Sequence, residues 1–394
     1  MRASEQLVAH CAADEVDLHA LHAIETAPAC GRCRPQGDRV RLPSLLPARF
    51  SRRLRAWTLL CACAPLSGCY LLQAASGQAD VMARSEPIPQ VIADPATPDA
   101  VRARLQLAQE AREFAVSSLD LPDGRSFRKY ADLGRDYALW NVVATPELSV
   151  EPRRWCFPVA GCVAYRGYFD EAGAQAQARR LARQGDDVTV GGVATYSTLG
   201  RLPDPLFNTM LGWRETRFVG TIFHELAHEL LYVPGDSAFN EAFASVVEEE
   251  GVRRWLLARG QAAELEAYET SLVRQADFAA LLREARERLA RLYASGRPPA
   301  ELRVEKQREL GRLKFQYSLQ RARWGGYAGY DAWFARTLGN AHLAAVATYH
   351  DCVPGLQREL AAAGSLPAFY ERAAALAELP MVARRAAVCA ELPR

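Results

Sequence analysis

Lysine and histidine are scarce in this chain, and neither sign of charge prevails. Of the 394 residues, seven are His and three are Lys, at positions 129, 306 and 314, so arginine carries nearly all the positive charge. The 48 basic and 46 acidic residues almost cancel, which leaves a formal net charge of +2. Proteins that bind nucleic acid carry a basic patch, and this balance provides none. We therefore expect no nucleic-acid partner.

Long apolar runs are also missing beyond residue 70, where no stretch reaches the roughly eighteen apolar residues of a transmembrane helix. A shorter apolar segment, residues 56–66, follows three Arg at positions 52, 53 and 55. A basic segment followed by a short apolar one is typical of a signal peptide. Residues 66–69 read L-S-G-C and resemble a bacterial lipobox. We expect acylation of Cys69; the alternative is a buried apolar helix with a chance Cys.

A lipid on Cys69 would anchor the protein in the bacterial cell envelope, facing the periplasm. Tyr70 stands where an Asp would favour retention in the inner membrane, so the resemblance to lipoproteins favours the outer membrane.

Four cysteines follow this segment, at positions 156, 162, 352 and 389. In an oxidising compartment, Cys156 could pair with Cys162, and Cys352 with Cys389. The alternative is four small buried side chains.

Strand patterns come before helical ones in the rest of the chain. Residues 137–144, 162–168 and 187–197 are rich in β-branched and aromatic residues, which favours strands, and Gly191-Gly192 is expected to break the last one. Residues 262–294 and 300–320 have helical periodicity on either side of a Gly- and Pro-containing turn, which predicts an αα-hairpin that serves as a structural arm. The expected fold class is α+β and mainly helical, with a small mixed sheet.

Residues 224–228 read H-E-L-A-H within an apolar helical segment. His224 and His228 are four residues apart and therefore lie on one face of a helix, where both imidazoles can reach one zinc ion. Glu225 lies beside that face, where its carboxylate can take a proton from a water molecule at the metal. The alternative is a pair of core histidines that are hydrogen-bonded to their neighbours.

A catalytic zinc ion usually has three protein ligands. After a turn at Val233-Pro234-Gly235, a second helix begins with Asp236 or Ser237 as its cap and carries Glu241 in its first turns. An antiparallel second helix would bring Glu241 to the two histidines, so we expect it to be the third ligand. The alternative is a Glu that interacts with the helix dipole. Rival ligands are Asp236, Glu248, His342 and His350.

Asn240-Glu241-Ala242 resembles the gluzincin pattern of thermolysin-like enzymes, in which this Glu is the third zinc ligand. The chain also resembles a bacterial family described as putative zinc aminopeptidases, many of them predicted lipoproteins. The resemblance runs from about Cys69 to near residue 370, and the matching stretches are residues 68–70, 73–78, 155–162, 165–169, 196–200, 222–228 and 240–241. It implies a zincin-like catalytic core, one zinc ion per chain and aminopeptidase activity.

Several further residues are candidates for the site. Asn240 and Ser245 could hydrogen-bond to the zinc ligands. Residues 193–199 could offer a strand edge to a peptide, or could be plain sheet. Side chains that could stabilise the oxyanion are Tyr349, His350, His342, Tyr327 and Arg323, although each has an alternative structural role.

These patterns divide the chain into four parts. Residues 1–50 are expected to be a non-native or disordered extension, residues 51–68 the signal peptide, residues 69–96 an extended lipid-anchored lead-in, and residues 97–394 a zinc metallopeptidase domain with the arm at about 262–320. The predicted function is zinc-dependent hydrolysis of a peptide or protein substrate, by an aminopeptidase as the resemblance implies. The alternatives are an endopeptidase, or a non-enzymatic lipoprotein scaffold with a structural zinc.

Overall fold

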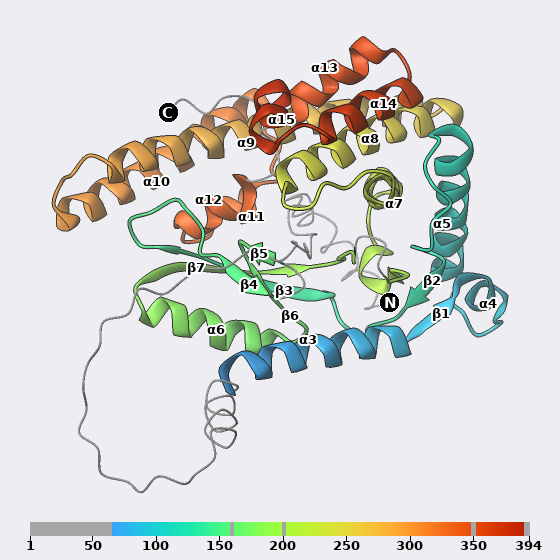
Figure 1. Ribbon diagram of the computed structural model, residues 1–394, viewed down its shortest axis with the longest axis horizontal. Helices are drawn as coiled ribbons and strands as arrows, with labels where there is room; N and C mark the ends of the chain where they lie inside the picture. Colours follow the sequence, from blue (N-terminus) through green and yellow to red (C-terminus); the bar gives the residue numbers. More distant parts are fainter. Residues whose placement is uncertain (1–64, 158–160, 199–201, 348–351, 390–394) are drawn as a thin grey trace, which may run out of the picture.

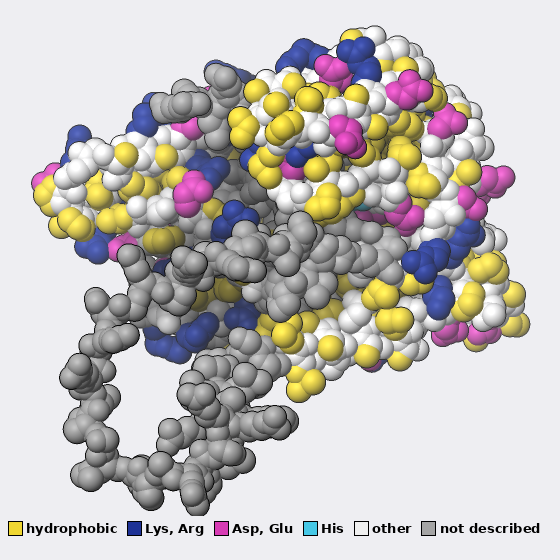
Figure 2. All heavy atoms as spheres, in the orientation of Figure 1, with side chains coloured by type: hydrophobic (Ala, Val, Ile, Leu, Met, Phe, Trp, Pro, Cys, Tyr) yellow, Lys and Arg dark blue, Asp and Glu magenta, His cyan; other side chains and the backbone are white. Residues whose placement is uncertain are grey.

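The computed structural model describes residues 65–157, 161–198, 202–347 and 352–389. Figure 1 shows three small sheets below a layer of long helices. The prediction of a mainly helical α+β protein with small sheets is confirmed. None of the described helices is long and apolar enough to cross a membrane. Over the described surface in Figure 2, acidic and basic side chains are interspersed, as the balanced composition leads one to expect.

The segment that was expected to be an extended lead-in is mostly helical, so that prediction is wrong. Helix α3 (Pro65–Ala83) is followed by β1 (Ser85–Pro87), α4 (Ile88–Ala93) and α5 (Asp99–Ser118). Tertiary contacts hold α3 in place: the Gln73 amide donates to the Gly167 carbonyl and accepts from the Phe169 amide, and Val81 is fully buried. These partners lie about ninety residues away in the sequence. The local sequence, which contains Gly and Ser, therefore does not indicate that this segment is helical.

The central sheet is antiparallel, with strand order β6-β3-β7. It consists of β3 (Leu139–Pro146), β6 (Arg166–Tyr168) and β7 (Asp186–Val193). Gly191-Gly192 does not break β7, contrary to expectation, because these residues pair in register with Asn141 and Trp140. The missing Cβ of Gly192 leaves room for the Tyr137 ring, which a Cβ would approach to 2.4 Å.

Alternating side chains of β3 bury both faces of this sheet. Val142 and Ala144 pack with residues of α6 (Glu171–Arg183), whereas Val143 packs with Ala341 and Ala344 of α12 (Asn340–Ala347). The sheet therefore lies between α6 and α12, as Figure 1 shows.

Two smaller sheets flank the central one. Strand β2 (Lys129–Ala131) pairs with β1 in antiparallel and with β8 (Leu206–Phe207) in parallel orientation, which makes this sheet mixed. The hairpin of β4 (Trp155–Phe157) and β5 (Gly161–Val163) contains the Cys156–Cys162 disulfide. The second disulfide joins Cys352 to Cys389, so both expected pairs are bonded in the structure.

The helical body starts after the 3-10 turn η2 (Asn208–Met210) with α7 (Glu215–Leu230) and α8 (Ser237–Ala258). Helices α9 (Ala262–Tyr293) and α10 (Pro299–Arg323) form the predicted αα-hairpin, whose facing stripes include the buried residues Leu289 and Leu313. The remaining helices are α11 (Asp331–Phe334), α12, α13 (Val353–Ala363), α14 (Leu366–Ala377) and α15 (Met381–Val388). The largest apolar core joins α5, α7, α8 and the C-terminal helices, and it forms a rigid base for the site described next.

Candidate metal centre and active site

The H-E-L-A-H segment lies in the second half of α7, and His224, Glu225 and His228 are only 2–3% exposed. This burial follows from the sequence, since apolar residues such as Phe223 and Leu226 surround the motif and belong to the main core. A buried helix that carries three ionisable side chains needs partners for them, because an unpaired buried polar group is costly.

Helix α8 supplies the third member of the group, as the sequence predicts. A short turn reverses the chain after α7, and Glu241, in the second turn of α8, is 2% exposed beside both histidines. His224, His228 and Glu241 each offer one ligand atom, and the three atoms lie within 4.8 Å of one another.

The spacing of these atoms fits a tetrahedral metal ion. The Nε2 atoms of His224 and His228 are 3.2 Å apart, His224 Nε2 lies 3.4 Å from Glu241 Oε2, and His228 Nε2 lies 3.6 Å from Glu241 Oε1. Two ligands about 2.05 Å from a zinc ion at the tetrahedral angle are separated by about 3.3 Å. Glu241 Oε1 is buried and has no hydrogen-bond partner among the described residues, so a lone pair is available for an ion. Two imidazoles and a carboxylate form a donor set that suits zinc.

The two histidines and the carboxylates around them shift one another's pKa values. Burial alone raises the pKa of Glu241, but the adjacent His228 and His224 outweigh it and lower that pKa to about 2. Burial alone lowers the pKa of His224, whereas its interactions with Glu241 and Glu248 raise it well above the ordinary value. The carboxylate of Glu241 is thus held ionised, which is the state that a metal ligand requires.

Glu225 is the one member of the motif that makes no contact with a partner in the described part of the chain. Both of its carboxylate oxygens are buried and have no hydrogen-bond donor among the described residues. Asp204 lies near enough for the two charges to interact: burial, and to a smaller extent the charge of Glu225, raises the pKa of Asp204 to about 6, although hydrogen bonds from Thr198 and Ser197 oppose this. A buried carboxylate that is free of protein hydrogen bonds is available to bind a water molecule or a substrate proton.

Glu248, which the sequence offered as a rival ligand, has another position. Its Oε2 lies 2.9 Å from Nδ1 of His224, on the side of the ring opposite Nε2, the atom that faces Glu241. A carboxylate at Nδ1 fixes the tautomer that leaves Nε2 free for a metal. The sequence contains a signal for this role, since Glu248 lies seven residues, or about two helical turns, after Glu241 on the same face of α8.

The other rival ligands are engaged elsewhere or lie outside the described residues. Asp236 is paired with Arg384 and Arg385. His342 lies beside Trp333, its Nδ1 accepts a hydrogen bond from the Gly339 amide, and burial lowers its pKa to about 4. His350 falls in the segment that the structure does not describe, as does Tyr349.

Among the described residues, the Asn240 side chain hydrogen-bonds to the turn and not to a proposed metal ligand. Its side-chain amide donates to the Val233 carbonyl and accepts from the Val233 amide, both at 2.8 Å, so it closes the turn between the two helices. Residues 193–199 were a candidate for a peptide-binding strand edge or plain sheet, but β7 ends at Val193, and residues 194–198 are not in a strand. The following residues are buried, and Ser197 and Thr198 donate hydrogen bonds to Asp204.

A cavity of about 1140 Å³ reaches His224 and Glu241 from the side of α8 and α9. Ser245, Glu248 and Glu249 line it on α8, and Tyr327 lies on its far wall. Ser245 and Tyr327 thus lie on the same cavity as two members of the group, whereas Arg323 does not line it and donates to Gln320.

Comparison with known proteins assigns the chain to a family. A family model described as putative aminopeptidase matches residues 69–388. Searches of curated proteins and of solved structures found no significant match. The matched span includes the whole His224, His228 and Glu241 group, so the resemblance noted from the sequence is confirmed. The chain belongs to the putative aminopeptidase family.

Proposed function

We propose that this protein is a zinc-dependent aminopeptidase in which His224, His228 and Glu241 hold the metal. The observation that carries the proposal is the convergence of three side chains: the two Nε2 atoms lie 3.2 Å apart, and each lies 3.4 or 3.6 Å from one of the two oxygens of Glu241. Beside them is a buried Glu225 without a hydrogen-bond donor among the described residues. A purely structural metal site would not need such a free carboxylate beside it.

A zinc ion held by His224, His228 and Glu241 would supply a Lewis acid that can polarise a peptide carbonyl and lower the pKa of a water molecule to about 7. Glu225 then acts as the general base: a carboxylate oxygen accepts the proton of the attacking water and passes it to the amine nitrogen that leaves. Glu248 holds the proton on Nδ1 of His224, which keeps the imidazole in the required orientation.

The size of the adjoining cavity supports a peptide substrate. Small-molecule sites occupy roughly 300–1,000 Å³, whereas this cavity has about 1140 Å³. The family supports cleavage at a free amino end, and an endopeptidase is the alternative.

The experiment that tests the proposal measures zinc content and hydrolysis in parallel. Wild type should contain one zinc per chain and cleave a peptide with a free amino end. Glu225→Gln should keep its zinc and lose about 10²–10⁴-fold in kcat, and Glu241→Ala and His228→Ala should lose both zinc and activity. Full zinc retention by Glu241→Ala would remove Glu241 as a ligand. Equal cleavage of the same peptide with an acetylated amino end would favour the endopeptidase.

We also propose a lipid anchor on Cys69 and a location in the periplasm, with the outer membrane favoured. The two disulfides support an oxidising compartment. Labelling of cells with a radioactive fatty acid should mark the wild type and leave Cys69→Ala unmarked. Label in both proteins would exclude Cys69 as the acylated residue.

A further inference from the structure

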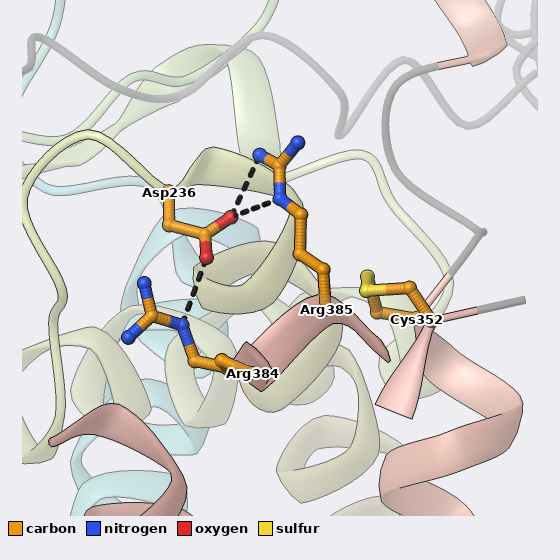
Figure 3. The surroundings of a disulfide bond; sticks show 5 residues. Asp236, Cys352, Arg384 and Arg385 are labelled. Atoms are coloured by element: carbon orange, nitrogen blue, oxygen red, sulfur yellow. Dashed lines mark hydrogen bonds and ion pairs between the residues drawn. A yellow bond between two sulfur atoms is a disulfide. The ribbon is translucent and has the colours of Figure 1, made fainter. Parts of the chain in front are cut away.

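Asp236 is a fully buried carboxylate at the end of the turn between α7 and α8. Figure 3 shows two arginines of α15 converging on it. Arg384 Nε donates to Oδ2 at 2.8 Å, and Arg385 donates to Oδ1 from Nε at 3.0 Å and from Nη2 at 2.8 Å. Although Asp236 occupies the N-cap position of α8, its side chain makes no capping hydrogen bond there. Its carboxylate therefore connects α8 to α15.

The turn that contains Asp236 leads directly into the metal group. The Asp236 amide donates to the Val233 carbonyl, and the Asp236 carbonyl accepts from the Asn240 amide at 3.1 Å. The side chain of Asn240 also forms two hydrogen bonds with the backbone of Val233. Because Glu241 follows Asn240 in the same helical turn, a shift of Asp236 would move Glu241 relative to His224 and His228.

Further hydrogen bonds and a ring contact fix the side chain of Arg384. It is 3% exposed, and its Nη1 donates to the carbonyls of Ala377 and Leu379 at 2.8 and 2.9 Å. Its guanidinium lies 5.3 Å from the centre of the Phe239 ring, in the first turn of α8. A buried carboxylate that loses such a partner is strongly destabilised, so the turn would have to move to reach water.

The second disulfide fixes the end of α15. Cys389 directly follows α15, and Cys352 directly precedes α13, which packs against α8. The two helices are in close contact, since a Cβ on Gly355 would lie 1.8 Å from the Val388 carbonyl oxygen. The disulfide thus holds α15 in the position from which Arg384 and Arg385 reach Asp236.

We infer that Asp236, Arg384 and Arg385, together with the Cys352–Cys389 disulfide, are positioning residues that hold Glu241 in register with the two histidines. This inference rests on the proposed function for the identity of the metal. It predicts that the C-terminal helix, more than a hundred residues from the motif in sequence, sets the affinity of the zinc site.

The test measures the zinc dissociation constant of the purified protein by competition with a coloured chelator. Arg384→Gln and Asp236→Asn should each bind zinc about 10–100-fold more weakly, the range found when residues that orient metal ligands are lost. The double variant Asp236→Asn/Arg384→Gln replaces the ion pair by two neutral side chains. Its loss of zinc-binding free energy should be smaller than the sum of the losses in the two single variants. Arg372→Gln, which removes a more exposed pair with Glu359 between α14 and α13, is the matched control and should bind as the wild type does.

Two milder variants keep the test decisive if the buried ones fail to fold. Arg385 is 44% exposed on its side chain, so Arg385→Gln should fold and bind zinc a few-fold more weakly. Cys352→Ser/Cys389→Ser should also weaken binding, whereas Cys156→Ser/Cys162→Ser, which removes the disulfide between β4 and β5, should not. Circular dichroism of the zinc-free proteins checks the fold in each case.

The outcomes separate this inference from the proposed function. If wild type binds zinc and the folded variants bind it equally well, the positioning role is wrong and the metal site stands. If wild type binds zinc and hydrolyses no peptide while the variants lose affinity, the inference stands and the peptidase proposal is wrong. If the wild type binds no zinc, both are overturned.

Discussion

Glu248 Oε2 lies 2.9 Å from His224 Nδ1, so a residue of α8 orients a proposed metal ligand of α7. The same helix face provides Glu241 to the other nitrogen of that ring. One pair of antiparallel helices thus supplies the proposed ligands, the proposed base and the orienting carboxylate.

Replacement of Glu248 should weaken the metal site without removing a ligand. In Glu248→Ala, the His224 ring loses the partner that fixes its tautomer, and zinc affinity should fall about 10–100-fold. Chelator competition measures this change. Glu250→Ala is the control, since Glu250 pairs with Arg254 at 2.7 Å, away from the histidines. Equal affinities in the two variants would contradict the role of Glu248.

Gly220 should be needed for Glu248 to approach His224. A Cβ at this position would lie 2.8 Å from Glu248 Oε1 and 3.2 Å from Val252 Cγ2. Gly220→Ala should therefore displace the Glu248 side chain and lower zinc affinity, by less than Glu248→Ala does because the side chain is flexible. Gly311→Ala, in α10 with nothing within 4 Å of its Cβ, should leave zinc binding unchanged and stabilise the fold by about 0.5–1 kcal/mol. Unchanged zinc affinity in Gly220→Ala would refute the steric argument.

Glu249 should make the metal-free protein less stable as the pH rises from 4.5 to 8. Burial, together with the charges of Glu248 and Glu269, raises its pKa to about 7, although Gln357 and Arg253 oppose this shift. The native state therefore holds a proton that the unfolded state has released above about pH 4.5. The stabilisation that this proton provides is complete below that pH and is lost as the pH passes 7.

The difference should be on the order of 3 kcal/mol, since one pKa unit corresponds to about 1.4 kcal/mol and the pKa rises from 4.5 to about 7. Urea unfolding of wild type and Glu249→Gln, both with chelator present, measures it at pH 4.5 and pH 8. The variant should gain stability relative to the wild type as the pH rises. Parallel curves for the two proteins would show that Glu249 does not titrate in this range.

Lys306 should anchor the α9–α10 arm to the sheet. Its side chain is 5% exposed, and Nζ donates to Asp187 Oδ2 at 2.6 Å and to the Glu147 carbonyl at 2.8 Å. Lys306→Ala leaves Asp187 partly buried without its counter-charge, so the free energy of unfolding should fall by roughly 3 kcal/mol. Lys314→Ala is the matched control, because Lys314 only donates to the Arg336 carbonyl at an exposed position. It should change stability by less than about 0.5 kcal/mol in the same urea titration.

Local sequence patterns were sufficient to predict much of the candidate site. The i, i+4 spacing of His224 and His228 determines that both rings lie on one face of α7 wherever that helix packs. The turn at Val233–Gly235 and the apolar periodicity of the next segment placed Glu241 correctly beside them. The arm at 262–320 followed in the same way from its two apolar stripes.

Other features depend on partners that are distant in sequence. Residues 70–83 are helical because of contacts with residues near 168, and Gly191-Gly192 continue β7 because β3 supplies hydrogen bonds to that strand. Glu248 looked like a ligand by composition, and only the packing of α8 on α7 over Gly220 directs it to Nδ1 of His224.

Asp236 is the clearest example of a residue whose partners the local sequence could not predict. Its sequence context marks it as a helix cap, because capping depends on residues within one turn. Its actual partners, Arg384 and Arg385, lie about 150 residues further along the chain. The sequence by itself determined which chemical groups share the face of one helix, since helical periodicity is local. Only the tertiary structure decided which carboxylate joins the two histidines, which one orients a histidine and which one holds the turn, since burial and charge pairing depend on how distant segments pack.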